Sequence, residues 1–209
     1  MKNRKIILAS KSPRRKQLLE QIGLEFEIRE SEYEEDMEAM SDPYKLVKFL
    51  ALKKCEDVAK YYDDAIIIAA DTFIIFDNKF IGKPKDINDA RKILKSFSGK
   101  EHEVVSGLAI IDTKSKKIIN DYNIGGVKFR VLGDEEIDSY LKTGDALDKA
   151  GAYAIQEESA VFIESVSGDY YSIVGLPLYK LYLALKEMGV DALLVNSKQP
   201  FVVKTMEDK

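Results

Sequence analysis

The sequence AIIIAADTFIIF, residues 65–76, decides the fold class. Its first half, residues 65–70, is an unbroken apolar run rich in β-branched residues, which is typical of a strand buried on both faces. We expect Asp71 and Thr72 to interrupt this strand and residues 73–76 to resume it. A carboxylate within an apolar strand is unfavourable unless it is paired, hydrogen-bonded or bound to metal. Asp71 is therefore a candidate site residue, with a structural polar residue as the alternative.

Helix and strand signals alternate on both sides of this run. A helix that starts at Asp42-Pro43 is expected to reach about Tyr61. Loops are expected over the acidic run 30–38 and the Gly/Ala-rich segment 144–156. The other expected helices are 13–23, where Ser12 is a plausible cap, 88–97, 134–141 and 177–188, and the other expected strands are 6–9, 26–28, 104–112, 117–122, 127–132, 161–166, 193–195 and 201–203. This order predicts an α/β protein with a mixed sheet and flanking helices, and we expect residues 1–209 to form a single domain.

Composition excludes several classes of protein. The net charge of −4 argues against a basic nucleic-acid binder. The single cysteine, Cys55, excludes an internal disulfide framework and a multi-cysteine zinc site, and the single histidine, His102, excludes a His-rich metal site. We interpret both as structural residues. Every apolar run is too short for a membrane span or a signal peptide, so we expect a cytoplasmic protein without a membrane partner.

The sequence SKSPRR, residues 10–15, joins an expected strand to the start of an expected helix. Backbone N–H groups at a helix start have no intrahelical partners and favour an anion. The guanidinium groups of Arg14 and Arg15 match phosphate oxygens, and Ser10 and Ser12 add hydroxyl donors. The segment therefore predicts a phosphate-binding turn, with a capped helix bearing exposed basic residues as the alternative. It lacks the glycine spacing of a Walker P-loop.

Four further features give weaker signals when each is taken alone. Lys83 lies on a loop between Gly and Pro, where an ordinary surface turn is the favoured interpretation. Lys54 lies near the apolar side of its helix, although lysine stems often cover apolar surface. Gln156 follows a run of small residues, and its amide suits the edge of a base. The acidic run is most simply a solvated loop, but one of its carboxylates could join Asp71 at Mg²⁺.

Six sequence blocks, in chain order, resemble the Maf family of nucleoside triphosphate pyrophosphatases, also called septum-formation-inhibitor-like proteins. These blocks are LASKSPRR at 8–15, ADT at 70–72, IGKPKD at 81–86, SGKEHEV at 98–104, DKAGAY at 148–153 and VGLP at 174–177. The resemblance runs from about Ile6 to Leu185. It implies a twisted mixed sheet related to the inosine-triphosphate pyrophosphatase architecture, with two lobes around a cleft and a homodimer as the expected assembly.

The resemblance also implies a reaction. The family cuts nucleoside triphosphates between the α- and β-phosphates and releases pyrophosphate. By motif position, Asp71 is the proton acceptor, and Glu35 is a carboxylate of the cleft. The positions that contact substrate are Ser10, Ser12, Arg14, Arg15, Glu35, Lys54, Thr72, Lys83 and Gln156. A divalent cation, Mg²⁺ with Mn²⁺ as the alternative, would have Glu35 and Asp71 as its candidate ligands.

Substrate preference is implied by the three positions that separate subgroups of the family. Arg14, Thr72 and Gln156 together resemble the dTTP/UTP subgroup rather than the 7-methyl-GTP subgroup, with modified pyrimidine triphosphates as further substrates of a housecleaning enzyme. The residues Glu157-Glu158-Ser159 depart from the family pattern, which usually has a Gly-containing loop there, and Gly125 stands where Thr is usual. The alternative function is a nucleotide- or nucleic-acid-binding regulator of cell division with little catalysis. A sugar-nucleotide transferase is a weaker alternative, because the Gly-rich loop expected of it is absent.

Overall fold

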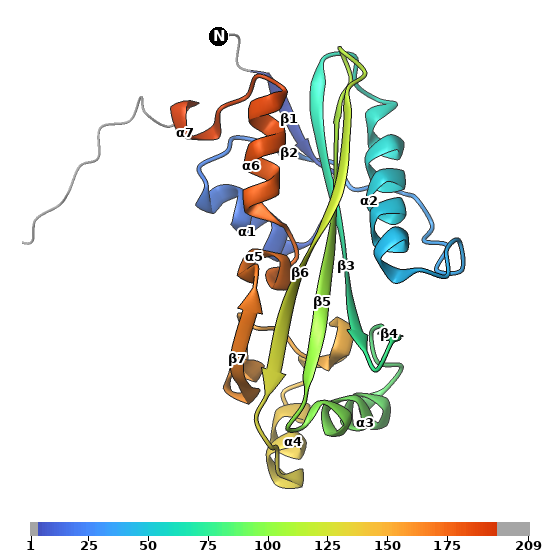
Figure 1. Cartoon of the computed structure of the whole chain (residues 1–209), viewed down its shortest axis with the longest axis vertical. Coiled ribbons are helices and arrows are strands. Elements are labelled where there is room, and N and C mark those ends of the chain that lie inside the picture. Colours follow the sequence, from blue (N-terminus) through green and yellow to red (C-terminus); the bar gives the residue numbers. More distant parts are fainter. Residues whose placement is uncertain (1–3, 196–209) are drawn as a thin grey trace, which may run out of the picture.

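The computed structural model describes residues 4–195, which contain one seven-stranded mixed sheet with helices on both faces (Figure 1). The strand order is β2-β1-β3-β5-β6-β7, and β4 pairs with β3. Strand β1 runs parallel to β2 and β3, whereas every other pair is antiparallel. The strands are β1 (Lys5–Leu8), β2 (Glu27–Ile28), β3 (Ala65–Phe76), β4 (Lys79–Ile81), β5 (Glu101–Asp112), β6 (Ile118–Phe129) and β7 (Ile163–Gly168). The predicted mixed α/β fold is confirmed.

The helices cover the sheet in three groups. One face of the sheet packs against α1 (Pro13–Gln21), α5 (Tyr170–Val174) and α6 (Leu178–Glu187), and the opposite face packs against α2 (Pro43–Ala59) (Figure 1). The third group lies at the far end of the long strands: α3 (Ile87–Phe97), α4 (Asp134–Leu141) and the 3₁₀ turns η1 (Ala150–Ala152) and η2 (Glu158–Phe162). The short helix α7 (Ala192–Val195) follows α6. Among the described residues, no helix has both the length and the apolar character of a membrane span.

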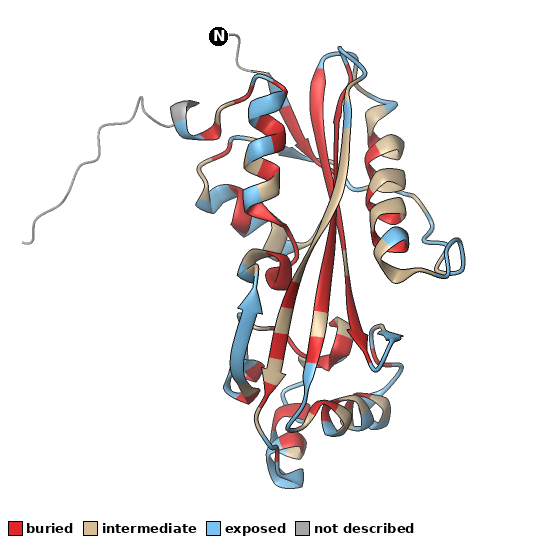
Figure 2. Cartoon of the chain, viewed as in Figure 1, coloured by how far each residue is buried: buried red, intermediate tan, exposed pale blue. Residues whose placement is uncertain are grey.

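Alternation along the strands builds the core. Ile66 and Ile68 of β3 pack with α1 and α6, whereas Ile67 and Ala69 pack with α2 on the opposite face. Beyond the middle of the strand, Ile74 packs with α3 and α4. Strands β3 and β5 are buried along most of their length, while β7 is largely exposed (Figure 2). The first two groups of helices, on the two faces of the sheet, form one lobe, and the third group at the far end of the long strands forms the other.

Local sequence signals explain where the helices start. The Asp42 side chain accepts hydrogen bonds from the N–H groups of Tyr44 at 2.9 Å and Lys45 at 3.2 Å, which caps α2. Pro13 occupies the first position of α1, where its missing N–H is harmless. Ser12 stands at the N-cap of α1 as predicted, but its side chain makes no capping hydrogen bond. The start of α1 therefore rests on proline and backbone geometry.

Several predicted boundaries are wrong. Strand β3 is continuous, because Asp71 pairs with Gly107 and Thr72 with Ser106 in the ladder to β5, so polar side chains do not break it. The predicted strands 117–122 and 127–132 are one strand that ends at Phe129. Gly125 lies within this strand and does not form a turn. A Cβ at this position would lie 2.4 Å from Cγ1 of Ile173, so the glycine allows α5 to pack closely against the strand.

Short elements account for the other differences. Residues 79–81 form β4 and residues 170–174 form α5, although neither was predicted. Residues 193–195 were predicted as a strand but lie in the short helix α7. The predicted strand 201–203 lies outside the described residues. These elements have only three to five residues, which is too short for a periodic pattern to show in the sequence.

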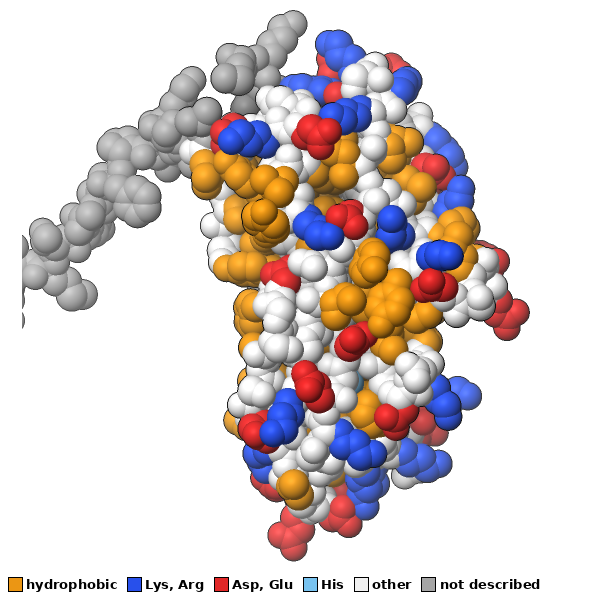
Figure 3. Space-filling view, in the orientation of Figure 1, with side chains coloured by type: hydrophobic (Ala, Val, Ile, Leu, Met, Phe, Trp, Pro, Cys, Tyr) orange, Lys and Arg blue, Asp and Glu red, His pale blue; other side chains and the backbone are white. Residues whose placement is uncertain are grey.

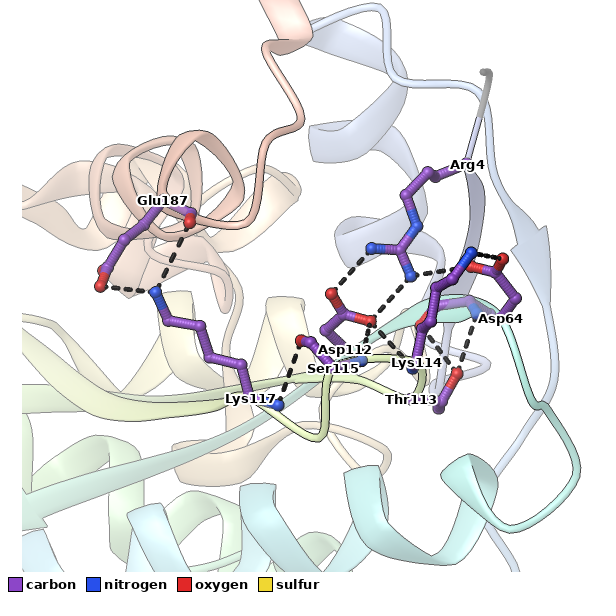
Figure 4. A network of polar contacts seen from close by, with 9 residues as sticks. Arg4, Asp64, Asp112, Thr113, Lys114, Ser115, Lys117 and Glu187 are labelled. Atoms are coloured by element: carbon purple, nitrogen blue, oxygen red, sulfur yellow. Dashed lines mark hydrogen bonds and ion pairs between the residues drawn. The ribbon is translucent and has the colours of Figure 1, made fainter. Parts of the chain in front are cut away.

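A network of ion pairs connects the segments at the start of β1, the start of β3 and the end of β5 (Figure 4). The Arg4 guanidinium donates from Nη1 to Oδ2 and from Nη2 to Oδ1 of Asp112, both at 2.7 Å. Arg4 Nη2 also lies 3.0 Å from Asp64 Oδ1, and Lys114 Nζ lies 2.7 Å from Asp64 Oδ2. The network joins the chain before β1 to the start of β3 and the end of β5.

Candidate active site

A gap beside β3 positions the candidate site. Strand β1 pairs with β3 as far as Ile68, and β4 pairs with it from Ile74. Among the described residues, no strand pairs with this edge between those two positions. Asp71 and Thr72 lie in the gap, where β1 has turned away into the Ser10 segment. A cleft of about 950 Å³ opens there.

The cleft brings together most of the residues predicted as site residues. The following side chains, which come from five separate segments, line it: Ser10, Ser12, Arg14, Arg15, Glu35, Lys54, Asp71, Thr72 and Lys83. Gln156 is exposed and does not line the cleft as the structure describes it. Its assignment to base recognition stays a prediction.

Asp71 is bound through only one of its two carboxylate oxygens. Its Oδ1 accepts a hydrogen bond from Lys54 Nζ at 2.7 Å, and the same ammonium lies 2.6 Å from Glu35 Oε1. Asp71 Oδ2 is buried and, among the described residues, has no hydrogen-bond partner. Burial raises the pKa of the Asp71 carboxyl above its ordinary value, against the opposing charges of Lys54 and Arg15. The cleft therefore contains a carboxylate with a free acceptor and increased basicity.

Arg15 has neutral partners at each of its three nitrogens. Its Nε donates to the Gly175 carbonyl at 3.0 Å, its Nη1 to Ser10 Oγ at 3.1 Å and its Nη2 to Thr72 Oγ1 at 3.3 Å. Burial lowers the pKa of this guanidinium, although Asp71 and Glu35 act in the opposite direction. Neutral acceptors fix the guanidinium without cancelling its charge. Arg15 is therefore held ready for an anion.

Thr72 is positioned from the other side by β5 and α5. Its hydroxyl lies 2.8 Å from the Ser106 hydroxyl, which donates to the Ser172 carbonyl at 2.7 Å. Ser106 and Ser172 are both fully buried. This chain of contacts could not be predicted from the sequence, because Ser106 is a single hydroxyl in an apolar strand and only the fold brings it to Thr72.

The remaining predicted cations differ in their surroundings. Arg14 Nη1 lies 3.3 Å from Glu157 Oε1. Lys83 is exposed on its loop, and the carbonyl of its neighbour Gly82 accepts a hydrogen bond from Gly151 N at 3.0 Å. This bond ties the Lys83 loop to the DKAGAY block, which also lines the cleft.

The backbones of α2 and β5 approach each other closely, which places Lys54 of α2 beside Asp71. A Cβ at Gly107, the ladder partner of Asp71, would lie 2.4 Å from the Val47 carbonyl oxygen of α2. Any side chain there would push α2 away from the sheet. Glycine in the middle of an apolar strand was a signal available in the sequence, because such a residue often marks a close approach of another backbone.

Two carboxylates fit a divalent cation that arrives with an anionic ligand. Glu35 and Asp71 converge on the Lys54 ammonium, which shows that their oxygens can share one cation. The described residues contain no group of three or more His, Cys, Asp or Glu side chains suited to a metal. Mg²⁺ commonly takes one or two carboxylates and completes its shell with water and substrate phosphates. The residues present suit that arrangement through Glu35 Oε1 and Asp71 Oδ1, the two oxygens that share the ammonium.

His102 and Cys55 are structural, as predicted. His102 is buried and its Nε2 lies 2.7 Å from the Tyr153 hydroxyl. Burial lowers the pKa of this imidazole to about 4, so it is neutral at physiological pH. The Cys55 thiol is fully buried and donates to the Ile67 carbonyl at 3.3 Å, and burial raises its pKa, which suppresses thiolate reactivity.

Comparisons with known proteins show which family the chain resembles. A family model described as "Maf-like protein" matches residues 5–188. A dTTP/UTP pyrophosphatase of Clostridium botulinum is 48% identical over 195 residues, which covers 91% of this chain and 100% of the relative. One from Bacillus cereus is 45% identical over 188 residues, covering 90% and 97%. The Staphylococcus aureus Ham1 protein is a solved structure with a TM-score of 0.48 and 13% identity, covering 89% of this chain and 100% of that chain. On the family model and the identity to curated relatives, the chain belongs to the Maf family.

Proposed function

We propose that this protein is a nucleoside triphosphate pyrophosphatase that hydrolyses dTTP and UTP to the monophosphate and pyrophosphate. The names of relatives that match about nine-tenths of the chain support the substrate and the reaction. The observation that carries the proposal is the half-paired Asp71: one oxygen is anchored by Lys54, and the other is buried in the cleft with no hydrogen-bond partner among residues 4–195.

In the proposed reaction, a water molecule attacks the α-phosphorus of the nucleotide. Asp71 Oδ2 takes a proton from this water, and the raised pKa makes the carboxylate a stronger base. The new bond joins the water oxygen to the α-phosphorus, while the bond from that phosphorus to the bridging oxygen breaks. Pyrophosphate leaves with the electron pair of the broken bond.

The cations of the cleft have separate roles in this proposal. Arg15, which is fixed by neutral acceptors, holds the phosphate chain in place, and Arg14 and Lys83 neutralise its outer charges. Ser10 and Ser12 lie beside the start of α1, where phosphate oxygens are favoured. Lys54 keeps Asp71 oriented and ionised. Positioning and charge neutralisation account for most catalysis of phosphoryl transfer.

The proposal includes Mg²⁺, with Mn²⁺ as the alternative, held by Glu35 and Asp71. When bound, the ion would neutralise charge on the phosphate oxygens of the substrate. Loss of turnover on addition of EDTA, and its return with Mg²⁺, tests this assignment.

Recognition of the base, the assembly and the location of the protein are also proposed. Arg14, Thr72 and Gln156 would select dTTP, UTP and modified pyrimidine triphosphates. Residues 1–209 would form one domain that acts as a housecleaning enzyme of the cytoplasm. Acidic and basic side chains are interspersed over the face shown in Figure 3, which supports a small-molecule substrate over nucleic acid. A homodimer is proposed from exposed apolar residues such as Tyr179 and Leu183 on α6, and sedimentation equilibrium tests it.

A pyrophosphate-release panel with Mg²⁺ tests the proposed function. We expect release from dTTP and UTP, and little from CTP, 7-methyl-GTP, ITP or the common purine triphosphates. Release from 7-methyl-GTP alone would retain the reaction and overturn the proposed base preference. No release from any nucleotide by folded, metal-supplied protein would contradict the enzyme and favour the alternative of a binding regulator.

A further inference from the structure

The Glu157 carboxylate bridges two cations that line the cleft. Its Oε1 lies 3.3 Å from Arg14 Nη1, and its Oε2 lies 2.9 Å from Lys149 Nζ. Arg14 and Lys149 line the cleft, whereas Glu157 is not among its lining residues. Within the part of the chain that the structure describes, Glu157 is the only carboxylate paired with Arg14. The contact therefore links the loop after Tyr153 to the predicted phosphate-binding turn.

The loop holds this carboxylate firmly. Lys149 has 6% side-chain exposure, and its ammonium also donates to the Asp145 carbonyl at 2.5 Å and to Asp148 Oδ1 at 2.7 Å. The buried Ser159 hydroxyl both donates to and accepts from the backbone of Ala154 at 3.0 Å, which closes the loop. Glu157 is therefore held by Lys149 on one side and paired with Arg14 on the other.

Arg14 and Arg15 are consequently in opposite states in the free protein. Within the described part of the chain, the hydrogen bonds of Arg15 all go to neutral acceptors, so its charge is available. Arg14 meets a carboxylate, which presents the same kind of oxygen acceptor to a guanidinium as a phosphate does. A highly charged anion that reaches Arg14 must share it with Glu157, and it also meets repulsion from that carboxylate.

We propose that Glu157 is an internal competitor for Arg14, which weakens the binding of the nucleotide's phosphate chain and so sets the substrate concentration at which the cleft fills. This inference rests on the proposed function, in which Arg14 contacts substrate. The inference also gives a role to Glu157, which belongs to the segment that departs from the family pattern. The neighbouring Gln156 is exposed and does not take part in this contact.

Glu157→Gln tests the competition with little change of shape. Because partly exposed ion pairs are worth up to about 1 kcal/mol, we expect the KM for dTTP to fall by about two- to fivefold. The value of kcat should stay within about twofold, since the substitution leaves the Asp71 cluster unaltered. In an Arg14→Gln background the same substitution should give no such gain, because the competed cation is gone.

Glu158→Gln is the matched control. Glu158 is exposed and forms no ion pair among the described residues. Its substitution removes the same charge one position further along the chain. We expect its KM to match that of the wild type. An equal fall in KM for both variants would overturn the proposal in favour of bulk charge. An unchanged KM for Glu157→Gln would also overturn the proposal. A raised KM would overturn it by showing that Glu157 orients Arg14 for substrate binding.

Calorimetry with inorganic triphosphate separates this inference from the proposed function. We expect its Kd to tighten by about the same factor in Glu157→Gln and not in Glu158→Gln. If the Kd tightens but no nucleotide is hydrolysed, the proposed function fails and the competition stands. If dTTP is hydrolysed but Glu157→Gln leaves the Kd unchanged, the competition fails and the enzyme stands.

Discussion

Asp71 on β3 and Asp112 at the end of β5 are equally buried, at 6% and 5% exposure, on neighbouring strands of one sheet. Both oxygens of Asp112 are occupied: Arg4 binds them in a fork, and Oδ1 also accepts from the N–H groups of Lys114 and Ser115. Asp71 has one anchored oxygen and one without a described partner. The Arg4 side chain holds the pKa of Asp112 well below its usual range, whereas burial raises that of Asp71.

The difference shows that burial alone does not decide what a carboxylate does. At equal burial, hydrogen bonds to both oxygens stabilise the ionised form and tie strands together, as at Asp112. An unpaired oxygen leaves part of the desolvation penalty in place, as at Asp71. Such a group is retained where its basicity is useful. The following substitutions test this contrast, beginning with the largest expected effect.

Asp71→Asn should abolish most activity and preserve the fold. The amide cannot take the proton of the attacking water, so we expect kcat for pyrophosphate release from dTTP to fall by about 10²- to 10⁴-fold. The thermal unfolding midpoint should stay the same or rise, because a buried, half-paired charge is removed. Turnover like that of the wild type would remove Asp71 from the mechanism.

Lys54→Gln should give a smaller loss of activity. The substitution leaves Asp71 and Glu35 without the cation between them, which favours a protonated, inactive Asp71. We expect kcat at neutral pH to fall by about ten- to a hundredfold, the lower part of the range for acid–base effects. Lys53→Gln is the matched control, since Lys53 pairs with Glu56 on the exposed side of α2. Equal losses in both variants would contradict the assigned role of Lys54.

Asp112→Asn should change stability without changing kcat. It leaves the partly buried Arg4 guanidinium without its bidentate partner, so we expect a loss of about 1–3 kcal/mol in the free energy of unfolding. Asp64→Asn removes an exposed partner of the same arginine and should cost at most about 1 kcal/mol. Urea unfolding measures both. Equal losses would mean that the buried fork contributes nothing beyond a surface pair.

The stabilising effect of Asp112 also has a defined pH dependence. Its folded-state pKa is depressed, so the stabilisation is fully present above the unfolded value of about 3.9 and disappears as the pH falls through the folded value. The stability difference between wild type and Asp112→Asn should therefore shrink only in strong acid. A difference that is independent of pH across that range would contradict the assignment. Comparing the two proteins cancels contributions from other groups, including His102.

Much of the fold could be predicted from local signals. The apolar run at the start of β3, the Asp42-Pro43 start of α2 and Pro13 in α1 act through nearby backbone, so the sequence exposes them. The glycines Gly107 and Gly125 indicated no particular partner, because the helices that approach them are distant in sequence. The sequence shows where a glycine lies, but only the folded structure shows which part of the chain packs against it.

The candidate site divides in the same way. The grouping of Arg15, Lys54 and Asp71 in one cleft followed from residue chemistry and the family resemblance, which concern residue type. The support that Thr72 receives from Ser106, and the bridge made by Glu157, could not be predicted. Both are contacts between side chains on separate elements, and they depend on register and loop closure rather than on any motif.

The pH dependence of kcat, compared between the wild type and Lys54→Gln, tests the central claim most directly. The account predicts an acidic limb in the wild type above the ordinary Asp pKa of about 3.9, and a further shift to higher pH in the variant, since an opposing charge is lost. Circular dichroism at each pH establishes that both proteins remain folded. A limb that stays in place when Lys54 is replaced, or its absence from the wild type, would contradict Asp71 as the proton acceptor.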